Sequence, residues 1–152
     1  AARLGLTAEM TRLIVEERSA TPLELERLGR STSTEVLVIS RVIAVGGTPV
    51  ADLTDIVPVE TLRRADLGAD FRGSVLDIFL TRGSPLLSLS RTEILAESAG
   101  DSRSGRLGVS PDTPLLVLVA QLYSFDERIV DYSVSAFVPG YFRIHVMRQV
   151  RP

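Results

Sequence analysis

The sequence contains neither lysine nor cysteine, so all 17 of its basic residues are arginine, against 19 acidic residues. Without cysteine, disulfide scaffolds, cysteine–zinc sites and thiol catalysis are excluded. Because lysine is absent, any anionic group of a ligand must be met by arginine or by backbone N–H groups.

Excess positive charge and long apolar runs are missing as well. A net charge of −2 disfavours direct binding of this chain to a phosphate backbone. The longest apolar run, Leu115–Ala120, is far shorter than the ~20 residues that span a bilayer. No signal peptide is recognisable. We expect a cytoplasmic chain without a membrane partner.

What is present indicates an ordered globular protein. The 152 residues are 45% hydrophobic and 24% charged, which is typical of a folded domain. This length favours a single domain over residues 1–152, large enough to fold around its own core.

Periodicity and turn residues predict alternating short elements. Gly46 and Gly47 separate two runs rich in Val and Ile, which predicts a β-hairpin. Ser74 is a predicted helix N-cap with Asp77 at the capping-box position. The predicted helices are 7–12, 22–28, 61–67, 74–82 and 99–107, and the predicted strands are 13–20, 35–45, 50–57, 86–97, 115–125, 129–138 and 141–150.

The chain contains an internal repeat. Residues 17–40 align with residues 96–119 without a gap, so that Ala20 matches Ala99 and Gly29 matches Gly108. Two units are too few for a solenoid. They predict an α+β domain with a pseudo-twofold duplication, in which one antiparallel sheet carries helices on one face.

Motifs for catalysis are not found. The single histidine, His145, alternates with Tyr141 and Arg143 along a predicted strand, which is typical of an exposed position. The GxSxG, HExxH and P-loop patterns are absent. We therefore predict no catalytic residue, no metal site and no cofactor, although an Arg/Glu constellation in a pocket stays open as an alternative.

Features for anion binding are present. Gly73-Ser74 and Leu6-Thr7 open two predicted helices, and helix starts offer free N–H groups and the positive end of the helix dipole. Under the pseudo-twofold, these two starts are expected to converge. Arg41 interrupts an apolar strand, where its guanidinium needs a partner or a polar cavity.

Many short motifs in a fixed order resemble one protein family, the UTRA ligand-sensing domain of HutC-type regulators in the GntR family of bacterial transcription factors. The resemblance runs from about Leu6 to Arg148. The matching stretches are Leu6–Met10, Val38–Val50, Ile56–Pro58, Gly73–Ile78, Arg106–Val117, Ile129–Ser133 and Tyr141–Val146.

The resemblance implies a chorismate-lyase-like fold, a homodimer and a small-molecule effector held between sheet and helices. In such regulators a winged-helix DNA-binding domain precedes this one, and DNA is bound only through it. Effector binding is then expected to favour one of two arrangements of the dimer.

The resemblance also implies ligand-binding residues. Family members that bind phosphorylated sugars carry an Arg-x-Arg pair on the strand before the hairpin, and here Arg41 matches the first position while Ile43 occupies the second. Helix-start hydroxyls that hold phosphate match Thr7, next to Leu6, and Ser74.

Three further positions complete this expected site. The acidic residue that contacts sugar hydroxyls matches Asp131, an aromatic position matches Phe137 without the tyrosine hydroxyl, and a glutamate position holds Leu53. We expect an anionic metabolite, either a sugar phosphate or an organic acid. The apolar departures favour a carboxylate on a less polar molecule.

Two alternatives remain. An enzyme of chorismate-lyase type would turn over chorismate and would lack an upstream DNA-binding segment. A ligand-free dimerisation module would have its pocket filled by side chains such as Leu53, Leu76 and Phe137.

Overall fold

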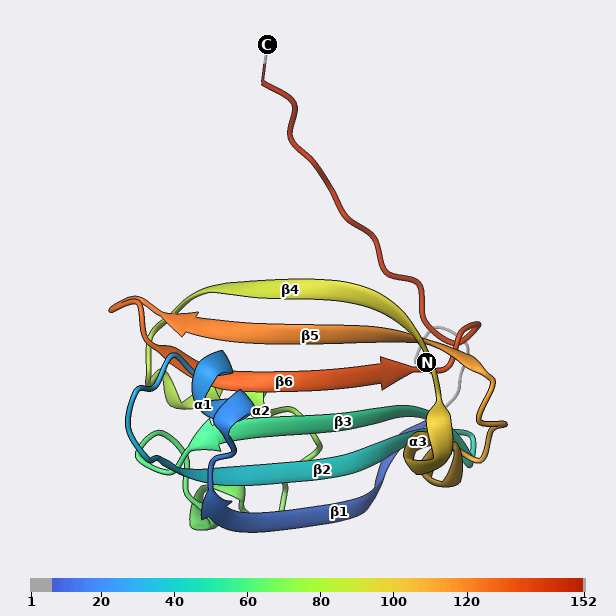
Figure 1. The fold of residues 1–152 in the computed structure, drawn as a ribbon, viewed down its shortest axis with the longest axis horizontal. Helices are drawn as coiled ribbons and strands as arrows, with labels where there is room; N and C mark the ends of the chain where they lie inside the picture. The colour runs from blue at the N-terminus through green and yellow to red at the C-terminus, as the bar shows by residue number, and fades with distance from the viewer. Residues whose placement is uncertain (1–6, 152) are drawn as a thin grey trace.

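The computed structural model describes residues 7–151, which form one six-stranded antiparallel sheet with short helices (Figure 1). None of the helices in this range is long and apolar enough to cross a membrane. The elements in chain order are β1 (Ala8–Ser19), α1 (Pro22–Arg27), β2 (Glu35–Val45), β3 (Thr48–Pro58), the 3₁₀ helix η2 (Arg64–Leu67), α2 (Val75–Arg82), β4 (Leu87–Ser98), α3 (Gly100–Leu107), β5 (Pro114–Ser124) and β6 (Ile129–Phe137).

The predicted duplication is confirmed by the strand order, β1-β2-β3-β6-β5-β4. The first, second and third strands of each repeat follow one another from an edge of the sheet to its centre, so β1, β2 and β3 correspond to β4, β5 and β6. Equivalent hydrogen bonds recur at matching positions: Ala20 N–H donates to the carbonyl of Thr34 over 2.9 Å, and Ala99 N–H to that of Thr113 over 2.8 Å. The helices α1 and α3 therefore occupy equivalent places, and β3 pairs with β6 at the centre.

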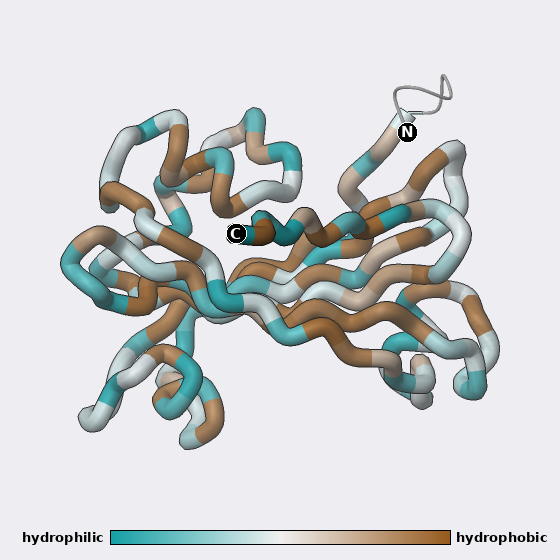
Figure 2. Tube along the Cα trace, turned by 90° about the horizontal axis from the view of Figure 1, so that it is seen from above, coloured by the Kyte–Doolittle hydropathy of each residue, from teal (hydrophilic) through white to brown (hydrophobic). Residues whose placement is uncertain are grey.

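Helices cover both faces of the sheet, so the prediction that they cover one face is wrong (Figure 2). Neighbouring residues of a strand point to opposite faces. On one face Leu37 packs with Phe79 of α2; on the other, Val36 packs with Leu28 at the end of α1. The connection between the two repeats, which forms η2 and α2, has no counterpart in the repeat and takes the face that α1 and α3 leave free.

The first strand replaces a predicted helix. Residues 7–12 do not form a helix, because β1 begins at Ala8 and pairs with β2 from Ala8 opposite Val45. A bulge between Thr11 and Ile14, with Arg12 at φ 52°, interrupts the pairing. The edge of β2 supplies hydrogen-bond partners that outweigh the local helix preference of this segment.

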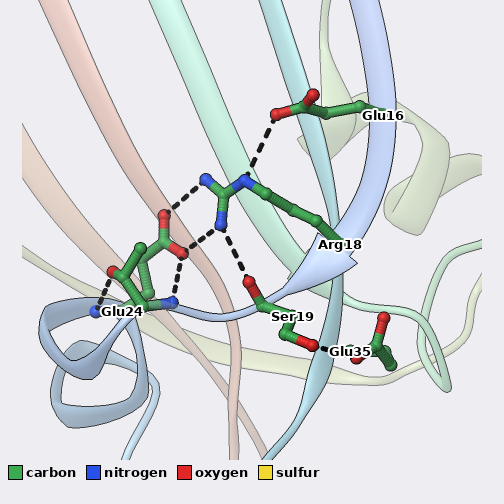
Figure 3. A network of polar contacts seen from close by, with 6 residues as sticks. Glu16, Arg18, Ser19, Glu24 and Glu35 are labelled. Carbon is green, nitrogen blue, oxygen red and sulfur yellow. Dashed lines mark hydrogen bonds and ion pairs between the residues drawn. The ribbon is translucent and has the colours of Figure 1, made fainter.

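A polar network fixes α1 against the end of β1 (Figure 3). Thr21 caps the helix, and Glu24 completes a capping box by accepting from the Thr21 N–H over 2.9 Å. Arg18 donates to both carboxylate oxygens of Glu24, over 2.7 and 2.9 Å. These charge-assisted bonds lower the pKa of Glu24 below its usual value and join strand to helix.

The predicted last strand, 141–150, is not part of the sheet. Past Gly140 the chain is extended, and Figure 1 shows it leaving the body beyond β4. Phe142 makes an edge-on contact with Phe137 of β6, with ring centroids 4.9 Å apart. The remaining predicted helices and strands are confirmed to within a few residues, with 61–67 reduced to the short η2.

Candidate functional site

A cavity of about 270 Å³ lies where α2 meets the sheet. The helices η2 and α2 cover one half of this face, and the cavity begins where that cover ends. Its polar lining consists of Arg41, Asp55, Ser74, Ser90, Asp131, Ser133 and Ser135, and its apolar lining includes Leu53, Leu76 and Leu122. We call it the Arg41–Asp131 cavity.

Arg41 connects three parts of the chain. Its side chain is buried, with 3% of the residue exposed, and it forms an ion pair with Asp55 of β3 at 2.5 Å. It also donates to the carbonyl of Ile39 over 3.1 Å and to the carbonyl of Gly73, directly before α2. Its Nε has no hydrogen-bond partner among the described residues. The guanidinium charge is thus largely compensated by Asp55, while the Nε–H and one N–H of Nη2 are left over.

Asp131 on β6 is buried beside this ion pair. Burial raises its pKa well above the usual range of a carboxyl group; the neighbouring Asp55 raises the pKa further, while Arg41 and the backbone N–H of Ile56 lower it. Asp131 therefore holds its proton to higher pH than an ordinary aspartate does. Its Oδ1 has no partner within residues 7–151.

The start of α2 forms one wall of the cavity. Ser74 caps the helix, its hydroxyl oxygen accepting from the Asp77 N–H over 3.1 Å, so its O–H remains able to donate. Gly73 has φ 104°, and a side chain there would press on Ile43 and Met10. A helix start with free N–H groups therefore faces the same space as Arg41 and Asp131.

Three larger hollows lie elsewhere, and one of them, of about 420 Å³, is lined by residues near Thr61 and Pro85. Another, of about 400 Å³, lies between η2 and α2 and is open to solvent, with mostly exposed charged residues. The third, of about 540 Å³, lies on the opposite face, where Arg106 and Asp52 form an ion pair at 2.9 Å and Nη2 of Arg106 has no hydrogen-bond partner among the described residues. Within residues 7–151, no group of three or more histidine or acidic side chains could hold a metal ion.

The structure brings together four of the residues that the sequence singled out. Arg41, Leu53, Ser74 and Asp131 all line the Arg41–Asp131 cavity. Their role in ligand binding stays a prediction. Sequence reasoning missed Asp55; its strand also carries Asp52 and Thr54, so no sequence pattern singled Asp55 out.

The other three predicted residues lie elsewhere. Thr7 does not open a helix; it precedes β1, and its carbonyl accepts from Gly46 N–H at the hairpin turn over 3.2 Å. The predicted convergence of two helix starts is therefore wrong. Phe137 lies outside the cavity lining and packs on Phe142, and Leu6 lies outside the described residues.

Comparison with models of known protein families matches residues 3–143 to the UTRA domain. The chain belongs to the UTRA domain family. The match covers both repeats and every residue that lines the cavity of this UTRA domain. A search of curated proteins found no match.

Solved structures share the fold of this UTRA domain. The effector domain of PhnF from Mycobacterium smegmatis is 20% identical with a TM-score of 0.81, over 98% of this chain and 92% of that one. The ligand-binding domain of a putative GntR-family transcriptional regulator from Bordetella bronchiseptica is 17% identical with a TM-score of 0.82. This match covers 94% of this chain and 90% of that one. These likenesses confirm the predicted α+β, chorismate-lyase-like fold class.

The same fold also occurs as part of a longer chain. A structure of PhnF from Mycobacterium smegmatis is 18% identical with a TM-score of 0.86, over 99% of this chain and 66% of PhnF. This UTRA domain therefore spans about two thirds of that regulator.

Proposed function

We propose that this UTRA domain is the effector-binding domain of a HutC-type regulator in the GntR family, and that the effector occupies the Arg41–Asp131 cavity. One observation carries the placement: Nε of Arg41 and Oδ1 of Asp131 are buried at one cavity and lack partners among the described residues. A buried polar atom without a partner costs about 1–3 kcal/mol. A ligand that supplies both partners recovers this free energy.

The chemistry of the cavity favours a small organic acid. About 270 Å³ accommodates only a small molecule. A carboxylate is matched by the N–H groups at the start of α2 and by the Ser74 hydroxyl, whereas hydroxyl or amine donors are matched by Asp131. Asp55 already compensates the charge of Arg41, so the cavity has too little positive charge to bind a doubly negative phosphate.

We further propose that this domain works as part of a dimeric repressor. A winged-helix DNA-binding domain precedes it in the whole regulator, and the effector releases the operator by favouring one arrangement of the dimer. Support for this arrangement comes from the family and from the share of PhnF that the chain spans.

Titration calorimetry of the purified domain tests the site. The panel contains hydroxy acids, amino acids, sugar phosphates and inorganic phosphate. We expect binding of a hydroxy or amino acid, at least tenfold weaker in Asp131→Ala, which removes the acceptor, and in Ser74→Ala. The matched control is Asp52→Ala, on the opposite face of the sheet, which leaves affinity unchanged.

Two outcomes separate the parts of the proposal. Preferential binding of a sugar phosphate would refute the organic acid and leave an effector domain in place. Equal weakening by Asp52→Ala would refute the placement of the ligand in the cavity, and failure of the whole panel would count against an effector-binding role.

The rival functions make different predictions. Turnover of chorismate by the purified domain would favour the enzyme. A ligand-free module is disfavoured by the cavity itself, because Leu53 and Leu76 line it without filling it and Phe137 packs elsewhere.

A further inference from the structure

The register of the sheet places three buried charged side chains in one diagonal row. Arg41 of β2 lies opposite Leu53 of β3, and Asp55 is two residues further along β3. Asp55 in turn lies opposite Ser133 of β6, two residues after Asp131. Side chains two residues apart share a face of the sheet, and diagonal neighbours of this kind are within reach of each other. Arg41, Asp55 and Asp131 are each only 3–6% exposed.

Among the described residues, these three are the charged ones that line the Arg41–Asp131 cavity; α2, β4 and β5 contribute serine, glycine and apolar residues. One guanidinium therefore faces two carboxyl groups. With both carboxyls ionised, the site would bury a negative charge that has no partner, which is costly. In the ligand-free domain a proton on Asp131 removes this charge, in agreement with the raised pKa of the group.

The second carboxyl group distinguishes two kinds of ligand donor. A hydroxyl can donate to the unpartnered Oδ1 of Asp131, but it brings no charge, so the proton of Asp131 must stay. An ammonium group brings the missing positive charge together with three N–H donors. Ser133 and Ser135 line the cavity on the same face of β6 as Asp131, and their hydroxyl oxygens offer acceptors for the remaining N–H groups.

Arg41 and the start of α2 determine what the other end of the ligand carries. The Nε–H of Arg41 has no partner among the described residues and requires an acceptor. The Ser74 hydroxyl and the N–H groups at the start of α2 favour an acceptor with negative charge, which is a carboxylate. An α-amino acid carries an ammonium and a carboxylate on one carbon atom, so each charge is compensated by its own part of the cavity.

We propose that the effector is an α-amino acid whose ammonium group replaces the proton of Asp131, so that a proton leaves the protein on binding. This inference rests on the proposed function, since it takes the Arg41–Asp131 cavity as the effector site. The O–H bond of Asp131 breaks and its proton passes to the buffer. The ammonium keeps its own three protons and forms an ion pair with the carboxylate.

The exchange makes the affinities of an amino acid and of the matching hydroxy acid depend on pH in opposite ways. The amino acid binds the ionised form of Asp131. The hydroxy acid binds the protonated form, because its carboxylate beside an ionised Asp131 adds like charge. The ratio of the two affinities therefore rises with pH, by up to about tenfold per pH unit. This holds for any folded-state pKa of Asp131, since only the ratio of its two protonation states enters.

Titration calorimetry of the purified chain with matched ligand pairs tests the exchange. Each α-amino acid is compared with the hydroxy acid of the same carbon skeleton, such as alanine with lactate and serine with glycerate, between pH 5 and pH 7. Two buffers of different ionisation enthalpy measure the protons released. We expect the affinity ratio of amino acid to hydroxy acid to rise at least tenfold over this range, with proton release at pH 5 only for the amino acid.

Asp131→Asn supplies the decisive variant, because asparagine resembles the protonated acid and has no proton to exchange. We expect the affinity ratio to become independent of pH, the amino acid to bind at least tenfold more weakly at pH 7, and the hydroxy acid to bind almost as before. The matched control is Asp52→Asn on the opposite face, which is expected to keep the pH dependence of the wild type.

The outcomes separate this inference from the proposed function. An affinity ratio that does not change with pH, binding of hydroxy acids alone, or a pH dependence that persists in Asp131→Asn would overturn the exchange and leave the effector cavity in place. Failure of both members of every pair to bind would overturn the exchange and the proposed function together.

Discussion

Replacing Asp131 by asparagine is expected to stabilise the ligand-free domain at neutral and alkaline pH. Asparagine keeps an oxygen that accepts from the Ile56 N–H and places an NH₂ donor where the protonated acid has its O–H. It therefore imitates the protonated side chain without having to lose a proton. The wild-type carboxyl must either hold its proton or ionise in a buried site beside Asp55.

The direction and the size of this effect on stability follow from the raised pKa of Asp131. The unfolded chain ionises this group at its ordinary pKa of 3.8, while the folded chain holds the proton to higher pH. Wild-type stability therefore falls as the pH rises from about 4 through the folded-state pKa. Each tenfold decrease in the acid dissociation constant of Asp131 on folding lowers the free energy of unfolding at high pH by about 1.4 kcal/mol. This corresponds to roughly 3–6 °C in Tm for a domain of this size.

Thermal unfolding of both proteins between pH 4 and pH 9 measures the effect. The Tm of Asp131→Asn is expected to exceed that of wild type increasingly with pH. The contrasting variant is Asp55→Asn, which removes the charge paired with Arg41 and is expected to lose about 3–5 kcal/mol. A parallel pH dependence of wild type and Asp131→Asn, or a lower Tm of Asp131→Asn at pH 8, would refute the reasoning.

Three further predictions concern the framework. Arg41→Ala leaves a buried carboxylate unpaired and is expected to lose about 3–5 kcal/mol in urea unfolding, so lost ligand binding in this variant does not by itself identify a contact. Phe79→Ala is expected to lose about 3–5 kcal/mol, because its ring is fully buried; a loss below 1 kcal/mol would contradict the packing described for α2. Gly29→Ala and Gly108→Ala, both at φ 65°, are each expected to lose about 1–2 kcal/mol by the same assay, whereas Gly105→Ala inside α3 is not destabilising; unequal losses would contradict the equivalence of the repeats.

The sheet was predictable from the sequence because its main signals are local. Val- and Ile-rich runs, the Gly46-Gly47 turn and the repeat define β2, β3, β5 and β6 without knowledge of distant contacts. The two failures, at 7–12 and 141–150, both concern segments at or beyond a sheet edge. Their conformation depends on whether a partner strand is available, which no local pattern records.

The sequence does not predict which carboxylate pairs with Arg41. A two-residue turn at Gly46-Gly47 without irregularity would place Asp52 opposite Arg41. A register shift between Ile43 and Ala44 instead places Leu53 there, which brings Asp55 onto the same face and moves Asp52 to the other. One extra residue in a bulge thus decides which carboxylate accompanies the arginine.

The uneven cover over one face of the sheet also bears on how such a domain can change its specificity. Beneath η2 and α2, residues such as Leu37 and Val57 are fully buried and carry much of the folding free energy. On the same face, where this cover ends, Leu53, Ser133 and Ser135 are only partly buried. Substitutions there alter the shape and polarity of the cavity at a small loss of stability, so the uncovered part of the face is free to diversify.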